Sequence, residues 1–183
     1  MTERRESERG EPRPEIRSAL LEDAEAIALV HTTAWEETYR GLLPDAVIDR
    51  FQASHYAGDL WRTRLAKPTE IRNFVAVERA ADGAERVIGF ACAGPTKTPE
   101  HGKPGEMLAL YLLRERHGRG IGRSLWDAAL ADLRQRSLLP GLVWVLADNP
   151  ALEFYRRVGA KELARRPCRL EDAKHLVEVG LGF

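Results

Sequence analysis

Residues 105–130 read GEMLALYLLRERHGRGIGRSLWDAAL and carry the strongest structural signal in the chain. The run 105–113 is almost continuously apolar, which predicts a central strand covered on both faces. Glycines at 118, 120 and 122 follow among arginines, and apolar residues then recur at helical spacing to about Ser137. The stretch therefore predicts a strand, a glycine-rich turn and an amphipathic helix.

The glycine turn differs from two familiar phosphate-binding loops. A dinucleotide fingerprint with Gly118 and Gly120 in its first two places requires glycine at the sixth, where Arg123 stands. A nucleotide-triphosphate loop requires glycine in place of His117 and lysine in place of Arg123. Both of these nucleotide-binding modes are therefore excluded.

The physics common to anion-binding turns still applies here. A strand that ends in a glycine-rich turn and opens a helix directs several backbone N–H groups and the positive end of the helix dipole at one point. Glycine allows the backbone to approach a diphosphate without an intervening Cβ, and Arg116, Arg119 and Arg123 can add charge. The alternative is a tight strand-to-helix turn whose arginines form a solvated rim.

The rest of the chain predicts an α/β layered domain with a mixed sheet. Asp82-Gly83 is a turn signal between two apolar runs, which predicts an antiparallel hairpin. Asn149 and Pro150 mark a helix start, and Gly159 marks its end. The expected strands are 15–20, 72–79, 85–94, 141–148, 161–167 and 174–183, and the expected helices are 22–37, 45–51, 54–66 and 150–158.

Composition limits the class of protein. The chain has 183 residues, 44% of them apolar, which suits one domain at 15–183 behind a charged, disordered tail at 1–14. Twenty-eight basic residues balance 28 acidic ones, so neither nucleic acid nor a membrane surface is an expected partner. Two cysteines match no metal-ligand spacing, and no signal peptide or membrane span is evident. These features favour a cytoplasmic protein without a metal.

Two motifs resemble those of the GCN5-related N-acetyltransferase superfamily. Residues 105–130 are similar to its acetyl-CoA-binding core, although His117 replaces the usual Arg or Gln and Arg114 stands where proline is frequent. The later segment LADNPALEFYRRVGA resembles the second motif of the family at Asn149, Tyr155 and Gly159. Including the opening strand and helices, the resemblance covers about residues 15–183.

The resemblance implies a fold and a cosubstrate. The expected fold is α/β: a GNAT-like mixed, mainly antiparallel sheet with a splayed central strand pair and helices on both faces. The expected cosubstrate is acetyl-CoA, whose pyrophosphate binds the turn amides and whose pantetheine pairs with the strand like an added strand. The implied binding residues are Leu110, Leu112, His117, Gly118, Arg119, Gly120, Ile121, Gly122, Arg123, Ser124, Asn149 and Tyr155.

Three residues are the candidates for chemistry. An alkylammonium with a pKa of about 10.4 is mostly unreactive at neutral pH, so a base must remove its proton. By the resemblance Glu106 is that base, the Leu112 N–H stabilises the oxyanion, and Tyr155 protonates the departing thiolate. Each side chain also has a structural reading: Glu106 as an exposed strand-end carboxylate, Tyr155 as a core aromatic, and Asn149 as an ordinary helix cap.

Other residues of the first helix are candidates for the acceptor wall. His31, Glu36 and Glu37 could replace Glu106 or bind a cationic acceptor, whereas a histidine at such a position is more often partly buried and without a catalytic role. Trp35 and Tyr39 either line the acceptor groove or belong to the core.

The expected function is transfer of the acetyl group from acetyl-CoA to a primary amine by direct attack in a ternary complex. The acceptor is either a small-molecule amine or a protein amino group, and a homodimer is compatible with the family. Two alternatives remain: a degenerate CoA-binding sensor, and a protein-interaction module that uses the arginine-rich turn. The sequence does not identify the acceptor, because acceptor walls are built from variable helices and loops.

Overall fold

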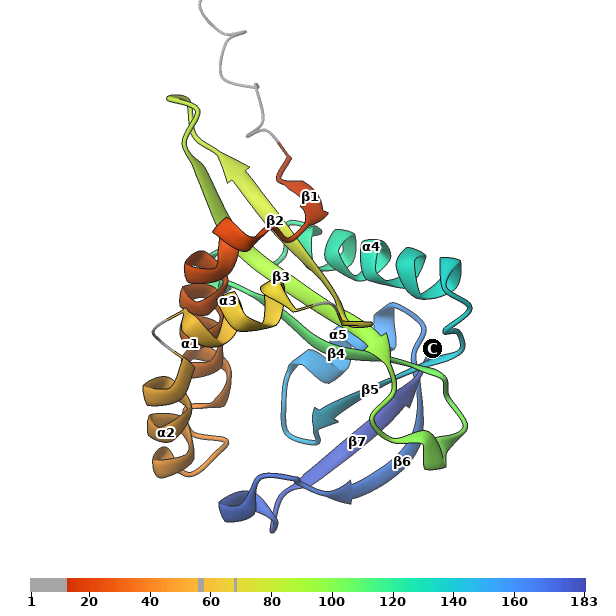
Figure 1. The fold of residues 1–183 in the computed structure, drawn as a ribbon. Helices are drawn as coiled ribbons and strands as arrows, with labels where there is room; N and C mark the ends of the chain where they lie inside the picture. The colour runs from red at the N-terminus through yellow and green to blue at the C-terminus, as the bar shows by residue number, and fades with distance from the viewer. Residues whose placement is uncertain (1–12, 56–57, 68) are drawn as a thin grey trace, which may run out of the picture.

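The computed structural model describes residues 13–55, 58–67 and 69–183, which form a sheet between two layers of helices (Figure 1). Within this part of the chain the strand order of the seven-stranded sheet is β1-β2-β3-β4-β5-β7-β6. The strands are β1 (Glu15–Ser18), β2 (Arg72–Arg79), β3 (Glu85–Pro95), β4 (Gly105–Leu112), β5 (Gly141–Leu146), β6 (Lys161–Pro167) and β7 (Val177–Gly182). The helices are α1 (Ala24–Tyr39), α2 (Asp45–His55), α3 (Asp59–Ala66), α4 (Ile121–Gln135) and α5 (Ala151–Arg157).

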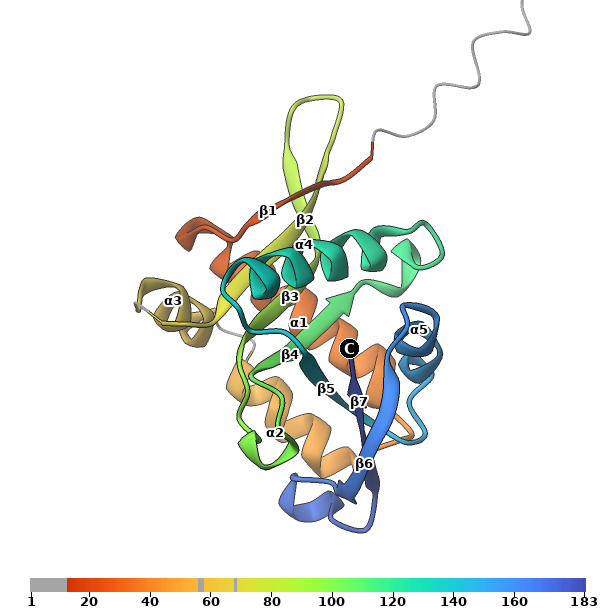
Figure 2. The same cartoon turned by 90° about the vertical axis from the view of Figure 1, so that its right-hand side faces the viewer.

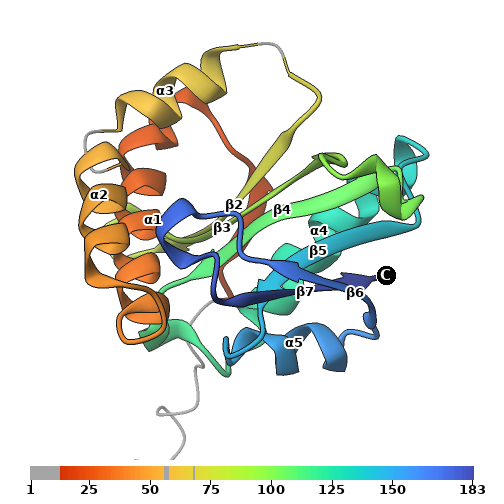
Figure 3. The same ribbon diagram turned by 90° about the horizontal axis from the view of Figure 1, so that it is seen from below.

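The helices cover both faces of the sheet, as expected. Seen from below, α1, α2 and α3 lie on one side and α4 and α5 on the other (Figure 3). Ile27 of α1 and Leu125 and Leu133 of α4 are fully buried at 0% exposure. Burying one such side chain contributes about 1.5–3 kcal/mol, so these apolar stripes fix the layers against the sheet.

The hairpin predicted around Asp82-Gly83 is confirmed. β2 and β3 pair antiparallel, and the Ala84 N–H donates to Asp82 Oδ1 at 2.9 Å. Gly83 has φ +84°, a left-handed conformation that glycine adopts at little cost. The expected tail 1–14 falls mostly outside the described residues.

The central strands β4 and β5 form the splayed pair that the family resemblance implies. They pair in parallel only at Gly105↔Gly141 and Glu106↔Leu142, and then they run apart (Figure 2). Opposite β3, the register passes from Ala109 directly to Met107, so Leu108 is an extra residue in β4. Such a bulge bends a strand and increases its local twist, which helps β4 to diverge from its neighbour.

One expectation for β4 is wrong. The apolar run predicts a strand covered on both faces, but residues 108–112 are only partly buried. The reason is the divergence from β5, which leaves this half of the strand without a neighbour along one edge. An apolar run therefore marks here a strand with one unpaired edge rather than the middle of a closed sheet.

The start of α5 differs slightly from the expected boundary. Asn149 Oδ1 accepts the Ala151 N–H at 2.8 Å, so its side chain caps the helix as expected. The helix itself begins at Ala151, one residue later than predicted, and Pro150 precedes it with helical dihedral angles. Gly159 ends the segment with φ +98°, as its position predicts.

Candidate active site

The glycine turn opens α4 without a side-chain cap. Gly120 is the N-cap residue with φ +80°, and Gly118 has φ +77°. A Cβ added at either glycine would meet no atom of the chain within 4 Å. The left-handed angles explain why glycine stands here, and the open space leaves room for a ligand group beside the first-turn N–H donors.

Arg116 and Arg123, which were expected to add charge around an anion, are paired with carboxylates. The Arg116 guanidinium donates to both oxygens of Glu78 on β2, at 2.7 and 2.9 Å. Arg123 Nε donates to Asp127 one helical turn later, at 2.8 Å to Oδ1. Arg116 therefore anchors the turn to the sheet, whereas the exposed Arg123 pair is weak and exchangeable.

Backbone donors near the end of β4 point toward the side where β5 has diverged. The Leu113 N–H donates to Ile88 O on β3 at 3.0 Å. Because N–H direction alternates along a strand, the Leu110 and Leu112 N–H groups face away from β3, toward the side where β5 has diverged. The Leu112 carbonyl oxygen faces the same side and lies 3.0 Å from His117 Nε2. The His117 ring thus lies against the unpaired edge of β4.

Glu106 lies where β4 still pairs with β5, on the face of the sheet that α1 covers. Phe90, Cys92 and Gly94 alternate along β3 toward that face, and their partners on β4 are Tyr111, Ala109 and Glu106. The Glu106 side chain belongs to a residue that is 7% exposed, so the expected alternative of an exposed strand-end carboxylate is wrong.

Hydrogen bonds hold the Glu106 carboxylate in one orientation. Oε2 accepts the Lys97 N–H at 2.7 Å and the Thr96 hydroxyl at 3.1 Å. Within the described part of the chain, Oε1 has no hydrogen-bond partner. One oxygen is therefore fixed, and the other remains available to a substrate.

The hydrogen bonds that hold Glu106 continue to β5 through two residues that the sequence did not point to, Thr98 and Trp144. The Thr98 N–H donates to Thr96 Oγ1 at 3.1 Å, and Trp144 Nε1 donates to Thr98 Oγ1 at 3.3 Å. Thr98 is fully buried. No local sequence signal reveals this contact, because the bulge and loop that bring residues 96–98 to Glu106 depend on strand register.

Tyr155 combines burial with an unused hydroxyl. The residue is 6% exposed, and its ring packs edge to face against Trp126 with centroids 5.6 Å apart. Its hydroxyl makes no hydrogen bond to any residue that the structure describes. Burial raises the pKa of Tyr155 well above its usual value, so the hydroxyl keeps its proton at neutral pH. The ring therefore belongs to the core, and the hydroxyl is free to meet a ligand.

Aromatic residues of α1 contact β4 at Tyr111. Trp35 Nε1 donates to the Tyr111 hydroxyl at 3.0 Å, and the Tyr39 hydroxyl lies 3.5 Å from the same oxygen. Burial raises the pKa of Tyr111 far above its usual value, so this hydroxyl stays protonated. Sequence reasoning named Trp35 and Tyr39 for the acceptor groove but did not name Tyr111, which joins them to the strand.

The other candidate bases on α1 are engaged elsewhere. His31 is 7% exposed, and its ring contacts Phe51, Trp61 and Phe90 among others. Burial, with smaller effects from nearby positive groups, lowers the pKa of His31 to about 3. Its Nδ1 has no partner among the described residues. A ring that stays neutral and enclosed fits the reading as a buried helix histidine.

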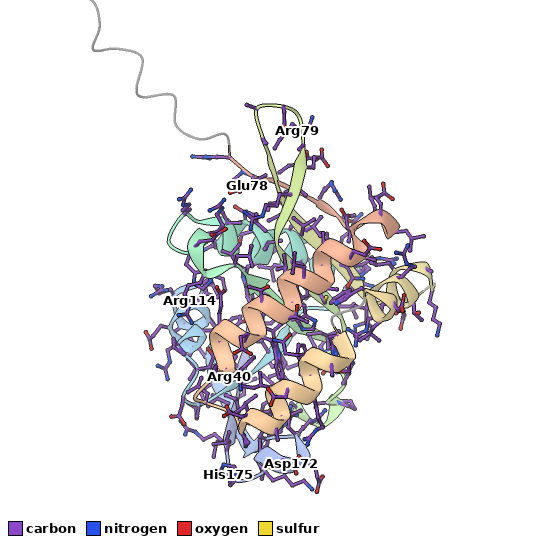
Figure 4. The ribbon with its side chains drawn as sticks, turned by 90° about the vertical axis from the view of Figure 1, so that its left-hand side faces the viewer. Arg40, Glu78, Arg79, Arg114, Asp172 and His175 are labelled. Atoms are coloured by element: carbon purple, nitrogen blue, oxygen red, sulfur yellow. The ribbon has the colours of Figure 1, made fainter. Side chains whose placement is uncertain are left out.

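The two carboxylates of α1 that were candidate bases, Glu36 and Glu37, bind arginine side chains or an arginine backbone N–H. Glu36 accepts two hydrogen bonds from the Arg40 guanidinium, at 2.7 and 2.9 Å. Glu37 Oε2 accepts the Arg114 N–H at 3.0 Å, and the Arg114 guanidinium also contacts the Glu37 carbonyl (Figure 4). Glu36 thus stabilises the end of α1, and Glu37 ties α1 to the segment that precedes the glycine turn.

The described residues include no group of three or more His, Cys, Asp and Glu side chains placed to hold a metal ion. None of the helices in the described ranges is both long enough and apolar enough to cross a membrane.

Comparison with known proteins places the chain in a family. The model of the acetyltransferase (GNAT) family matches residues 19–160. The uncharacterized N-acetyltransferase YuaI of Bacillus subtilis (strain 168) is 34% identical over 170 residues, which cover 92% of this chain and 91% of YuaI.

Solved structures show the same fold at lower identity. The PaiA N-acetyltransferase of Thermoplasma acidophilum, solved in complex with coenzyme A, has a TM-score of 0.70 at 22% identity, covering 93% of this chain and 99% of that one. Ard1 of Thermoplasma volcanium has a TM-score of 0.62 at 20% identity, covering 94% and 97%. Together with the family match, these similarities show that the chain belongs to the acetyltransferase (GNAT) family and is an acyltransferase.

Proposed function

We propose that this protein is an acetyl-CoA-dependent N-acetyltransferase whose active site is the cleft between β4 and β5. The observation that carries the proposal is that three kinds of group, a buried carboxylate, free backbone groups and a helix N-terminus, follow one another along β4 and the turn after it. They run from the buried carboxylate of Glu106, along the unpaired edge of β4, to the uncapped N-terminus of α4. Acid–base, backbone and anion-binding groups follow one another along this path in the order that a thioester of coenzyme A requires.

The cosubstrate binds mainly to backbone groups in this proposal. The pyrophosphate meets the N–H groups of residues 117–124, where the positive end of the α4 dipole and the left-handed Gly118 and Gly120 leave open space. The pantetheine amides pair with the free edge of β4 at Leu110 and Leu112. The Leu112 carbonyl already has one contact, with His117 Nε2 at 3.0 Å, so a pantetheine amide has to use its second lone pair or displace the His117 ring.

Three groups carry out the transfer. Glu106 Oε1 accepts the proton of the acceptor ammonium through a chain of water molecules, while Oε2 stays fixed by residues 96 and 97. A water chain is needed because six residues of extended strand, about 20 Å, separate Glu106 from Leu112. The neutral amine attacks the thioester carbon and forms the C–N bond, and the Leu112 N–H stabilises the negative charge on the carbonyl oxygen. The C–S bond then breaks, and the Tyr155 hydroxyl protonates the departing thiolate.

The acceptor in this proposal is a small-molecule amine or a protein amino group. The free buried thiols of Cys92 and Cys168 support a reducing, cytoplasmic setting. A CoA-binding sensor without turnover is favoured by one observation, the contact of His117 with the strand edge that pantetheine would use.

Turnover separates the enzyme from the sensor. The protein is incubated with acetyl-CoA and a panel of primary amines, and free thiol and acetylated amine are both measured. We expect thiol and product to appear in equal amounts with at least one amine. Stabilisation by acetyl-CoA in a thermal melt, with no product from any amine or peptide, would favour the sensor. A melt unchanged by acetyl-CoA and by CoA would contradict both.

A further inference from the structure

The indole ring of Trp144 on β5 is held in place by residues of β6 and β7. The Arg166 guanidinium of β6 lies over the ring, 3.5 Å from its centroid. Gly180 is the partner of Trp144 on β7, and a Cβ at this glycine would lie 2.9 Å from the indole, so a larger residue would push the ring aside. Arg166 is itself fixed, because its Nε donates to Glu178 Oε2 at 2.7 Å and both side chains are largely buried. The position of the indole therefore depends on a glycine and a paired cation.

The indole N–H begins a series of hydrogen bonds that ends at the proposed base. Trp144 Nε1 donates to Thr98 Oγ1 at 3.3 Å, and Thr98 Oγ1 lies 3.3 Å from Thr96 Oγ1. Thr96 Oγ1 in turn donates to Glu106 Oε2 at 3.1 Å. Thr98, in the middle, is fully buried, so solvent does not compete for its hydroxyl. These four side chains form what we call the hydrogen-bond chain.

The groups at its two ends give the hydrogen-bond chain one direction. An indole N–H can only donate, and an ionised carboxylate can only accept. Thr96 uses its one hydroxyl proton on Glu106, so the proton between the two hydroxyls must come from Thr98. Thr98 accepts from Trp144 on its other side. Every link therefore donates toward the carboxylate, and bonds arranged in this way strengthen one another.

This direction makes the two oxygens of Glu106 different. Oε2 accepts both the Thr96 hydroxyl and the Lys97 N–H, the latter at 2.7 Å. A proton on Oε2 would force the Thr96 hydroxyl to turn toward Thr98. The buried Thr98 proton would then have no acceptor among the described residues, which is unfavourable. A proton that reaches this carboxylate therefore goes to Oε1, the oxygen without a protein partner.

We propose that Trp144 is a positioning residue for the base: through the hydrogen-bond chain it fixes Oε2 of Glu106 and so directs the proton of the acceptor to Oε1. Gly180 and Arg166 take part by holding the indole ring. The inference rests on the proposed acetyl transfer and adds to it a residue that acts on turnover without contact to either substrate.

Thr98 allows the clearest test, because its hydroxyl can be removed and restored. Thr98→Val keeps the shape of the side chain, and kcat should fall about 3- to 10-fold, as expected for the loss of one neutral hydrogen bond. The KM for acetyl-CoA should stay unchanged. Thr98→Ser keeps the hydroxyl and should restore kcat. A wild-type kcat in Thr98→Val, or a Thr98→Ser as slow as Thr98→Val, would overturn the proposal.

Thr32→Val is the matched control for the loss of a buried threonine hydroxyl. Thr32 is 2% exposed, and its hydroxyl donates to Ala28 O at 2.9 Å within α1, outside the hydrogen-bond chain. This variant should keep the kcat of the wild type, and denaturant melts show that each variant is folded. A loss of kcat equal to that of Thr98→Val would mean that removal of any buried hydroxyl slows the enzyme, and it would contradict the positioning role.

Combined variants show whether the effect passes along the hydrogen-bond chain. Trp144→Phe removes the indole donor, and Gly180→Ala displaces the ring, so each should lower kcat in the same direction as Thr98→Val. Neither should slow Thr98→Val further, because groups that act through one network are not additive. Thr98→Val should likewise cause no further loss in Glu106→Gln, which has no base to position. Fully additive losses would overturn the proposal.

The indole proton reports on the hydrogen-bond chain without turnover. In NMR spectra of protein with isotope-labelled tryptophan, the Trp144 N–H signal is the one that Trp144→Phe lacks. Glu106→Gln replaces a charged acceptor by a neutral one and weakens every link, so it should move this signal, whereas Thr32→Val should not. A signal that Glu106→Gln leaves in place would overturn the hydrogen-bond chain.

The two readouts keep the proposals separable. A wild type that acetylates no amine would contradict the proposed function, and the indole signal would then decide by itself whether the hydrogen-bond chain holds the carboxylate. A wild type that acetylates amines, with Thr98→Val equally fast, would leave the proposed function intact and overturn the positioning role of Trp144.

Discussion

The glycine at the N-terminus of α4 allows a test of the anion site with a matched internal control. Gly120 has φ +80°, Gly83 in the β2–β3 hairpin has φ +84°, and a Cβ added at either meets no atom of the chain within 4 Å. Substitution by alanine therefore imposes the same kind of backbone strain at both sites and no steric clash in the free protein. That strain costs about 1–2 kcal/mol per residue.

The expected shifts follow from these values. For a chain of this size each kcal/mol changes Tm by about 2–4 °C, so both Gly83→Ala and Gly120→Ala should melt about 2–8 °C below the wild type. Acetyl-CoA at a hundredfold excess over its Kd stabilises the folded state by about 2.7 kcal/mol, which raises Tm by about 5–10 °C. Wild type and Gly83→Ala should both show this increase.

Gly120→Ala should lose most of the increase, because its methyl group occupies the space assigned to the diphosphate. A Kd weakened about a hundredfold reduces the linkage free energy to about 0.4 kcal/mol at the same ligand concentration. The assay is a thermal melt with and without acetyl-CoA, supported by calorimetric titration at a temperature where every variant is folded. If Gly120→Ala binds acetyl-CoA as tightly as Gly83→Ala, the diphosphate does not lie at this turn.

Three further predictions test individual side chains. Glu106→Gln can still accept the hydrogen bonds of residues 96 and 97 through its amide oxygen, so it should bind acetyl-CoA normally. Its turnover should fall about 10²-fold at neutral pH and should partly recover at higher pH, where more of the acceptor is free amine. The same loss at every pH would exclude a role of Glu106 as base. Tyr155→Phe removes a hydroxyl that has no hydrogen-bond partner among the described residues, so the denaturation midpoint should stay nearly unchanged. Acetyl transfer should slow about 10²-fold, because the proton donor to the thiolate is lost. Unchanged turnover would remove Tyr155 from the mechanism. The lowered pKa of His31, about 3 against 6.5 when unfolded, means that the unfolded state binds the extra proton as pH falls below 6.5. When the pH falls from 7 to 5, this group should therefore lower the free energy of unfolding of the wild type by about 2 kcal/mol. In denaturant titrations over the same interval, the free energy of unfolding of His31→Phe should fall by about 2 kcal/mol less than that of the wild type. Equal losses would show that His31 ionises while folded.

The sequence by itself determined the features that depend on local chemistry. Left-handed glycines at 118 and 120 can be read from residue type, since a turn that requires positive φ excludes most other residues. The hairpin at Asp82-Gly83 and the cap at Asn149 follow equally from short-range geometry. The second motif, with Tyr155, needed the family resemblance as well, because a tyrosine on an apolar helix face is by periodicity alone a core residue.

Tertiary structure decided which groups meet. The bulge at Leu108 and the brief pairing of β4 with β5 set which side of the strand carries free N–H groups, and these features depend on register between strands far apart in sequence. Register also brings Thr96 to Glu106, and it turned an expected exposed carboxylate into a buried one. For the same reason the partner of Arg116 could not be predicted from the sequence, because Glu78 lies 38 residues away on another strand. Contacts of this range depend on the packing of the whole sheet, and no local pattern of residues encodes them.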